Sequence, residues 1–306
     1  MCKDVCVIIP SYNNKEHLSK SLGSILRQKN IRQEVIITDD GSSGDTSEWL
    51  NHIAQRYDYI RIIEYNKSNI ANARNLAIEK SNCKFIAFLD AGDTWYDNKL
   101  ANQLQFMKTH PNCILTFTNY QNVDTHYQPI IDCFSYFSEF SKVCNFVNNE
   151  YITLNSPLNI LLKNNIIGTS SVMVKREKLM KSGFDPSLKS ASDWDCWLRL
   201  AMQGNFCFSH EITTDHLTPK NSNLKFQDKH LAALDEIITR IRAHPDVQPL
   251  TVKHAKASLN ESRADHHRQL GHKFHALKHA LQAVLLYPHK RNIKHFFHDI
   301  KQLMYI

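Results

Sequence analysis

Two acidic clusters in the first hundred residues have the residue types and the spacing to bind a nucleotide. Asp39-Asp40-Gly41-Ser42 and Asp90-Ala91-Gly92-Asp93 each follow a short apolar run, at residues 35–38 and 85–89. Such runs are typical of buried strands in a parallel sheet, and ligands bind at the carboxyl ends of those strands. Since the sequence offers these carboxylates no obvious lysine or arginine partner, we expect them to face a metal, ribose hydroxyls or base donors.

The turn after the first apolar run holds a ring, a hydroxyl and two amides, in the order Pro10-Ser11-Tyr12-Asn13-Asn14. An aromatic side chain at the end of a buried strand can stack on a base. A serine or asparagine that caps the next helix explains the same residues equally well. The turn alone therefore does not identify a site.

Alternating strands and helices must position these clusters. We expect strands at residues 5–10, 34–38, 60–65 and 84–89, and helices at residues 15–28, 46–57, 71–80 and 99–110. This alternation predicts βαβ units, and hence an α/β fold with a mostly parallel central sheet and helices on both faces.

The rest of the chain is less regular until about residue 225. We expect strands at 113–120, 166–175 and 206–209, a helix that begins at Ser192-Asp193-Trp194-Asp195, and an irregular excursion at 121–150 that is a candidate lid. Beyond residue 225 apolar residues recur at helical spacing, which predicts an all-helical appendage. They form two stripes, Phe274, Leu277, Leu281 and Val284, then Ile293, Phe296, Phe297, Ile300 and Leu303.

Length and composition limit the classes of protein. The 306 residues suffice for one large domain with an appendage or for two domains. The formal charge of +7 lies in residues 225–306, which hold 14 lysines and arginines against 7 acidic residues, and 11 of the 17 histidines. Such a tail either touches an anionic surface, such as a membrane face, or is a solvated helical surface.

Cysteine spacing and hydropathy point to the cytoplasm. The eight cysteines show no C-x-x-C spacing, which indicates reduced thiols. We find no signal peptide and no apolar stretch near the ~18 residues that a spanning helix needs. A cytoplasmic protein is therefore expected, with peripheral contact at the inner face of the membrane left open.

Five segments in order resemble the family 2 glycosyltransferases with the GT-A fold, over about residues 5–217. They are Val-Ile-Ile-Pro-Ser-Tyr-Asn-Asn at 7–14, Ile-Thr-Asp-Asp-Gly-Ser-Ser-Gly-Asp-Thr at 37–46, Asn-Ile-Ala-Asn-Ala-Arg-Asn-Leu-Ala at 69–77, Leu-Asp-Ala-Gly-Asp at 89–93 and Ser-Asp-Trp-Asp-Cys-Trp-Leu-Arg-Leu at 192–200. Five segments at matching order and spacing are far more specific than any one of them.

The resemblance implies a non-processive, inverting enzyme of polysaccharide or glycolipid biosynthesis. It would move a sugar from a nucleotide-sugar donor, UDP-sugar first among the candidates, to a hydroxyl of a glycan or lipid-linked acceptor. Mn²⁺ or Mg²⁺ would neutralise the charge that develops on the leaving diphosphate, and either ion suits oxygen ligands. No nucleic-acid partner is implied.

By position, the resemblance assigns donor contacts to the first strand ends. Tyr12 and Asp40 are similar to residues that contact the base, and Arg74 is similar to one that steadies the base or the phosphates. The alternative for Arg74 is an exposed helix arginine. Four neighbours complete the expected donor site: Pro10, Asp39, Asn69 and Ala91.

The metal motif departs from the family pattern, because Gly92 stands where a middle carboxylate is usual. The resemblance then implies Asp93 as the direct metal ligand, Asp90 at the ribose or the metal, and His216 as a further metal or phosphate contact. A lost carboxylate predicts weaker metal binding, or water in its place. The alternative function is a catalytically impaired nucleotide-binding or scaffold protein of the same fold.

Asp193 is similar to the family's catalytic base, which takes the acceptor proton as the hydroxyl attacks the anomeric carbon. The alternative is a capping box, because Ser192 and Asp195 have its spacing and acids are favoured in a first helical turn. The capping box accounts for Asp195 and does not require Asp193. Ser192 stands where the family often has an acid. The polar run Gly168-Thr169-Ser170-Ser171 before this helix either lines the acceptor pocket or is an ordinary polar loop.

The predicted organisation is a GT-A domain at 1–224, with a donor half at 1–118 and an acceptor half at 119–224, and a basic His-rich helical appendage at 225–306. The last helix is expected to lie on an anionic membrane surface or to pack its stripe on the preceding helix. Lysines and arginines among the tail histidines argue against a metal site there. A nucleotidyltransferase is a remaining rival, but residues 5–30 lack the Gly-rich basic phosphate loop that it would need.

Overall fold

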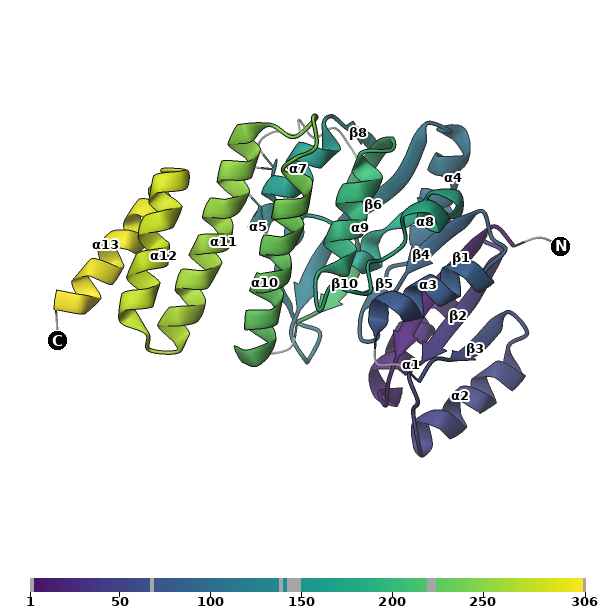
Figure 1. Ribbon diagram of the computed structural model, residues 1–306. Helices are drawn as coiled ribbons and strands as arrows, with labels where there is room; N and C mark the ends of the chain where they lie inside the picture. The colour runs from purple at the N-terminus through teal and green to yellow at the C-terminus, as the bar shows by residue number, and fades with distance from the viewer. Residues whose placement is uncertain (1–2, 67–68, 138–139, 142–149, 219–223, 305–306) are drawn as a thin grey trace. The chain divides into compact units, whose positions relative to one another are not determined.

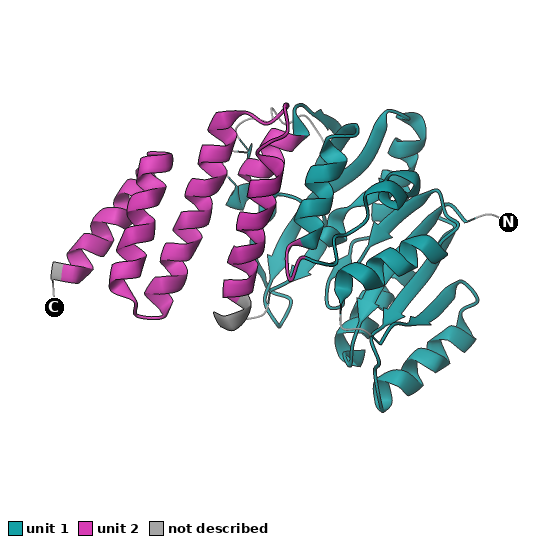
Figure 2. Ribbon diagram, viewed as in Figure 1, with its two compact units in different colours: residues 1–157, 165–187, 192–220 teal, residues 158–164, 188–191, 221–306 magenta. Residues whose placement is uncertain are grey.

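The computed structural model describes residues 3–66, 69–137, 140–141, 150–218 and 224–304. The chain forms two compact units, coloured separately in Figure 2: unit 1 is residues 1–157, 165–187 and 192–220, and unit 2 is residues 158–164, 188–191 and 221–306. The domain boundary expected after residue 224 stays a prediction.

Unit 1 begins with four parallel strands that lie in the order β3-β2-β1-β4. They are β1 (Val5–Ser11), β2 (Gln33–Asp39), β3 (Ile60–Glu64) and β4 (Phe85–Phe88). The helices between them are α1 (Lys15–Leu26), α2 (Asp45–Arg56) and α3 (Ile70–Lys80). All seven elements agree with the predicted alternation to within two residues, which is the usual uncertainty of an element's ends.

Each face of this sheet is covered by different helices (Figure 1). Alternate side chains of a strand point to opposite faces. Val5, Val7 and Ile9 of β1 pack with buried residues of α1, α2 and α4 (Lys99–Thr109). On the other face the ring of Phe88 lies 5.3 Å from that of Phe184 and 6.0 Å from that of Trp197 in α9 (Ser192–Ala201). The predicted α/β fold with helices on both faces is confirmed.

Beyond β4 the sheet is mixed. β9 (Met173–Lys175) runs antiparallel to both β4 and β6 (Cys113–Val123), and β10 (Asn205–Leu217) runs parallel to β6. Three short strands pair antiparallel with these: β5 (Thr94–Trp95), β7 (Pro129–Asp132) and β8 (Ile152–Leu154). The long β10 carries residues from the interior of the sheet to the carboxyl edge of the parallel strands.

The elements predicted for residues 113–217 need correction. The strand expected at 166–175 is limited to β9, and residues before it form a short 3-10 helix, η1 (Thr169–Ser171), which α8 (Arg176–Ser182) follows after β9. The strand expected at 206–209 is part of the 13-residue β10. The predicted excursion contains the end of β6, β7 and α5 (Cys133–Tyr136), while residues 142–149 of the candidate lid lie outside the described residues.

Unit 2 is helical, as predicted for the tail. After most of α7 (Pro157–Lys163) it holds α10 (Leu224–Ile241), α11 (Pro249–Gln269), α12 (Lys273–Leu286) and α13 (Lys290–Met304). The predicted apolar stripe is not the buried face of α12. That face consists of Ala276, Ala280 and Ala283, whereas Phe274 is 74% exposed. The small side chains of the alanines let α12 pack closely on its neighbours.

Within the described ranges, no helix is both long enough and apolar enough to cross a bilayer. The six cysteines in those ranges are buried free thiols, in agreement with the sequence, and Cys2 and Cys144 lie outside them.

Candidate functional site

The Asp90–Asp93 turn follows β4 at the carboxyl edge of the parallel strands. Its amide at Asp93 donates to the carbonyl of Asp90 at 3.1 Å. Ser21 of α1 supports the turn, since its hydroxyl accepts the Gly92 N–H at 2.9 Å and donates to the Asp93 carbonyl at 2.7 Å. A fully buried serine thus satisfies backbone groups that would otherwise be unpaired away from water.

Gly92 has a backbone that excludes the carboxylate expected from the family pattern. Its φ is +106°, and a Cβ would lie 2.8 Å from Cδ2 of Leu217 and 3.6 Å from Cγ of His17. An L-residue is strained at this φ, and here it would also meet a packed side chain. The shape of the turn is therefore a structural reason for a glycine at position 92.

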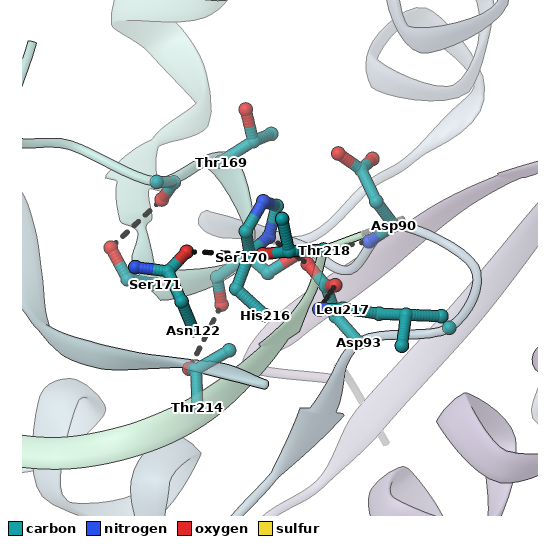
Figure 3. A network of polar contacts seen from close by, with 12 residues as sticks. Asp90, Asp93, Asn122, Thr169, Ser170, Ser171, Thr214, His216, Leu217 and Thr218 are labelled. Atoms are coloured by element: carbon teal, nitrogen blue, oxygen red, sulfur yellow. Dashed lines mark hydrogen bonds and ion pairs between the residues drawn. The ribbon is translucent and has the colours of Figure 1, made fainter. Parts of the chain in front are cut away.

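Asp93 is the centre of the polar network in Figure 3. Its carboxylate is buried and accepts three hydrogen bonds, from the Ser170 hydroxyl at 2.5 Å, the Leu217 N–H at 2.9 Å and Nδ1 of His216 at 3.1 Å. Burial lowers the pKa of His216, but the charge and hydrogen bond of Asp93, helped by Asp90 and Asp193, outweigh it and raise that pKa. The predicted metal residues Asp93 and His216 thus lie in direct contact.

Arg74 and Asp90 form an ion pair at the same edge, in which only Arg74 is buried. The Arg74 guanidinium lies 2.5 Å from Oδ1 of Asp90 and 5.3 Å from the ring centre of Phe184. Arg74 is only 4% exposed, so the alternative of an exposed helix arginine is wrong, as is the expectation that Asp90 lacks a basic partner. Among the described residues, the buried Nε of Arg74 has no hydrogen-bond partner, which leaves a donor for a ligand.

The ends of β1 and β2 hold the residues expected at the base. Ser11 pairs with Asp39 in the sheet register, and the Asp40 N–H donates to the Ser11 carbonyl at 2.9 Å. Tyr12 and Asp40 therefore follow the ends of two neighbouring strands, and Pro10 precedes Tyr12 in β1. The Tyr12 side chain is 61% exposed. An exposed ring at this edge is free to stack on a base.

Asp39 and Asn69 have structural partners. Buried Asp39 accepts the Ser42 N–H at 3.0 Å and the Ser42 hydroxyl at 2.5 Å, which closes the turn after β2. Asn69 caps α3 by accepting the Asn72 N–H at 3.1 Å, and its amide donates to the Pro186 carbonyl at 3.0 Å. Their roles in donor binding, like that of Ala91 within the Asp90–Asp93 turn, stay predictions.

Asp193 lies in the first turn of α9 and faces η1. Its Oδ2 accepts the Thr169 hydroxyl at 2.9 Å, and its Oδ1 accepts the Trp194 N–H at 2.9 Å. The neighbouring acid has a different environment, since buried Asp195 is ion-paired with Arg199 at 2.7 Å. The two acids of this first turn therefore have separate partners, and Asp193 is the one next to the Asp93 network.

Two serines support this site. Ser170 bonds to Asp93 and to the Asp90 N–H at 3.0 Å, and Ser21 holds the turn from α1. Ser170 belongs to the polar run that the sequence offered for the acceptor pocket, but its own hydroxyl contacts the Asp90–Asp93 turn. Ser21 was not assigned, although it is a polar residue on the apolar face of a helix with Leu18, Leu22 and Ile25.

The residues at this edge fit a divalent cation that arrives with a diphosphate. Two carboxylates, Asp90 and Asp93, and the imidazole of His216 are suitable ligand types. In the part of the chain that the structure describes, no three His, Cys, Asp or Glu side chains converge to hold a metal. Mg²⁺-like ions need no such cage, because one or two carboxylates with water and phosphate oxygens complete their coordination.

Comparison with known proteins agrees with this architecture. The model of glycosyl transferase family 2 matches residues 6–172. TuaG of Bacillus subtilis, whose name assigns it to teichuronic acid biosynthesis, is 31% identical over 201 residues, which are 65% of this chain and 73% of TuaG. WfgD of Escherichia coli, a UDP-Glc:alpha-D-GlcNAc-diphosphoundecaprenol beta-1,3-glucosyltransferase, is 31% identical over 66% of this chain and 71% of its own.

A solved structure shares the fold across nearly the whole chain. The mannosyltransferase PcManGT from Pyrobaculum calidifontis, in complex with GDP-Man and Mn²⁺, has a TM-score of 0.63 over 98% of this chain and 85% of its own. At 18% identity this likeness is evidence for the fold alone.

Proposed function

Since the chain belongs to the family 2 glycosyltransferases, we propose that it transfers a sugar from a nucleotide diphosphate donor to a hydroxyl acceptor, with inversion. One observation carries the proposal. Asp93 and Asp193, about 100 residues apart in sequence, hydrogen-bond to adjacent residues of the same buried turn, η1. A single displacement needs charge stabilisation at the leaving diphosphate and a base at the acceptor, and these two carboxylates supply one group for each task.

Asp193 is the proposed base. A general base must lie within hydrogen-bond reach of the proton that it accepts, and it must be ionised. The first turn of α9 favours a negative charge, and the Thr169 hydroxyl fixes one carboxylate oxygen. Asp193 is also partly exposed, so an acceptor hydroxyl can approach it.

The donor diphosphate and its metal ion are proposed to bind at four residues, Arg74, Asp90, Asp93 and His216. Arg74 brings a buried positive charge and an unpartnered Nε–H to the edge where the phosphates would lie. When bound, Mn²⁺ or Mg²⁺ would stabilise the charge of the leaving diphosphate, with Asp93, Asp90 and His216 as its protein ligands. The Ser170 hydroxyl and the Leu217 N–H already hold Asp93 at this place.

A UDP-sugar is the proposed donor, with Tyr12 and Asp40 at the base. The name of WfgD specifies UDP-Glc, and WfgD is 31% identical to this chain, whereas PcManGT with its GDP-Man is 18% identical. The names of WfgD and TuaG support a lipid-linked or glycan acceptor in polysaccharide or glycolipid biosynthesis.

We also propose that α12 and α13 contact an anionic membrane surface from the cytoplasmic side. Phe274 and Leu285 of α12 are 74% and 75% exposed, and Phe297 of α13 is 62% exposed. Exposed lysines accompany them along both helices: Lys278, Lys290, Lys294 and Lys301. Apolar side chains beside lysines suit the interface of an anionic bilayer, where a lipid-linked acceptor would also lie.

Substitution of Asp193 tests the proposed reaction. In a transfer assay with a panel of nucleotide sugars, Asp193→Asn should lower kcat by about 10²–10⁴-fold, the usual contribution of a general base. The affinity for UDP with Mn²⁺, measured by titration calorimetry, should stay close to that of the wild type, because Asp193 is assigned to the acceptor side.

Asp45→Asn is the matched control, since Asp45 is also an acid in the first turn of a helix but is exposed on α2. Asp45→Asn should have the kcat of the wild type. Full activity in Asp193→Asn would refute the base. UDP binding without transfer of any sugar by the wild type would instead favour a catalytically impaired nucleotide-binding or scaffold protein.

A further inference from the structure

Adjacent residues of η1 hold the two carboxylates on which the proposed reaction depends. The Ser170 hydroxyl donates to Oδ2 of Asp93 at 2.5 Å, and the Thr169 hydroxyl donates to Oδ2 of Asp193 at 2.9 Å. Both donors are buried, 3% and 6% exposed. Hydrogen bonds to ionised groups are about twice as strong as those between neutral groups, so each contact fixes its carboxylate firmly.

The Ser170 hydroxyl hydrogen-bonds to the first and the last residue of the Asp90–Asp93 turn (Figure 3). A hydroxyl has one donor and two acceptor positions. Ser170 uses its donor on the Asp93 carboxylate and accepts the Asp90 N–H at 3.0 Å. One side chain therefore sets where the whole turn lies relative to η1.

The η1 turn is itself anchored in the core. The Trp95 indole donates to the Ser170 carbonyl at 2.7 Å, and the Gln103 amide donates to the Ser171 carbonyl at 3.0 Å. Gln103 is in turn held by the buried Lys99 side chain, whose Nζ donates to Oε1 of Gln103 at 2.7 Å. Since these partners come from β5 and α4, η1 cannot shift without breaking buried hydrogen bonds.

We propose that Thr169 and Ser170 are positioning residues that set the spacing between the diphosphate side and the acceptor side of the active site. Ser170 places Asp93 and its turn, and Thr169 orients Asp193. Misplacement of reacting groups by about 1 Å can cost 10²-fold in rate, so a shared rigid support is a direct advantage. This inference rests on the proposed function.

Two variants should separate the two sides. Ser170→Ala should raise the Mn²⁺ concentration for half-maximal transfer by about tenfold, as expected when a group that holds a metal ligand is removed. Thr169→Val, nearly isosteric, should lower kcat about 10- to 100-fold with the Mn²⁺ requirement unchanged. Thr169→Ser restores the hydroxyl and should recover kcat.

Ser171→Ala is the matched control. Its hydroxyl lies in the same buried turn but donates to the Gly168 carbonyl at 2.8 Å, and among the described residues it bonds to neither carboxylate. It should change neither the Mn²⁺ requirement nor kcat. Equal effects of Ser170→Ala and Ser171→Ala, or wild-type kinetics in both Thr169→Val and Ser170→Ala, would overturn the proposal.

Hydrogen exchange without any ligand gives an independent result. Ser170→Ala removes the acceptor of the Asp90 N–H, so exchange in the peptide that contains residues 90–93 should become at least about tenfold faster. Thr169→Val and Ser171→Ala should leave that peptide unchanged. Unchanged exchange in Ser170→Ala would refute the anchor, whereas a wild type that transfers no sugar refutes the proposed function and leaves this measurement intact.

Discussion

At Gly92 the backbone has a φ of +106°, and Leu217 fills the space where a Cβ would lie. Gly92→Ala should therefore be destabilised both by a left-handed backbone conformation and by an overpacked contact. We expect its free energy of unfolding to fall by about 2–4 kcal/mol. Gly92→Asp adds the carboxylate of the family pattern but should lose at least as much, with no gain in Mn²⁺-dependent transfer. Urea denaturation and the transfer assay measure the two effects.

Gly44 provides the matched control for Gly92. It also has a positive φ, +55°, but nothing lies within 4 Å of a Cβ built there. Gly44→Ala should therefore be destabilised only by its backbone conformation, with a loss of about 1–2 kcal/mol in the free energy of unfolding. A stable Gly92→Asp variant with tighter Mn²⁺ binding would show that the turn accepts a middle carboxylate, contrary to this account.

Residues recognisable from local sequence were easier to predict than their partners. Asp93 and Asp193 stand in motifs, and the structure gives both of them contacts with η1. Ser170 was a candidate for the acceptor pocket, but its contact with Asp93 was not predicted, because the two residues lie 77 positions apart and only the sheet topology brings them together. Arg74 was assigned to the donor site, but its burial and its pairing with Asp90 required the packing of α3.

Elements with a regular period were predicted well, and those fixed by distant polar partners were not. The spacing of apolar residues distinguishes β1 to β4 from the helices between them, and this spacing is a local property of the sequence. Residues 166–175 carry enough apolar residues to suggest one strand. Residues 169–171 nevertheless form η1, in which the hydroxyls of Thr169 and Ser170 bond to carboxylates on other elements. Helical period also located α12, but only tertiary packing determined that its alanines face inward.

The exposed phenylalanines of α12 and α13 allow a test of the membrane proposal. The double variant Phe274→Ser and Phe297→Ser should bind vesicles of phosphatidylglycerol and phosphatidylcholine at least about tenfold more weakly, because each ring would lose its burial in the interface. Its thermal stability should stay near that of the wild type, since both side chains are largely exposed. Vesicle co-sedimentation measures the binding.

Ile130 of β7 is the control for surface apolarity, because it is 59% exposed and belongs to unit 1. Ile130→Ser should bind vesicles as the wild type does. Binding should also weaken as salt is raised, since the lysines contribute through screened charge. Equal binding by the double variant and the wild type would remove the membrane from the proposed function.

At the scale of the whole molecule, the histidines of unit 2 should make the two units respond differently to acid. The ring centre of His267 lies 5.2–5.8 Å from those of His266, His272, His275 and His279. Burial first, then the neighbouring histidines His275, His266 and His272, lower the pKa of His267, and Asp228 of α10 opposes this. Burial, His267, Arg263 and Lys278 likewise lower the pKa of His279, against a hydrogen bond that the protonated ring donates to Gln282.

A histidine whose pKa is lowered in the folded state takes up its proton more readily after unfolding. The unfolded chain then binds more protons as the pH falls below about 6.5, so the contribution of these histidines to the stability of unit 2 is present above that pH and is lost below it. Solvent screens these partly exposed rings, and the loss between about pH 7.5 and about pH 5.5 should therefore be only about 0.5–1 kcal/mol. Hydrogen exchange in peptides of α11 and α12 measures it, with β1 and β4 of unit 1 as the internal reference.

His267→Gln removes the ring that the other four surround and should flatten the pH dependence of exchange in α11 and α12. His110→Gln is the matched control, because His110 stacks on Phe106 in unit 1 and belongs to no such cluster. It should leave the difference between the two pH values as in the wild type. If α11 and α12 gained protection on acidification, or if His267→Gln kept the full pH dependence, the lowered pKa of His267 would not be the cause.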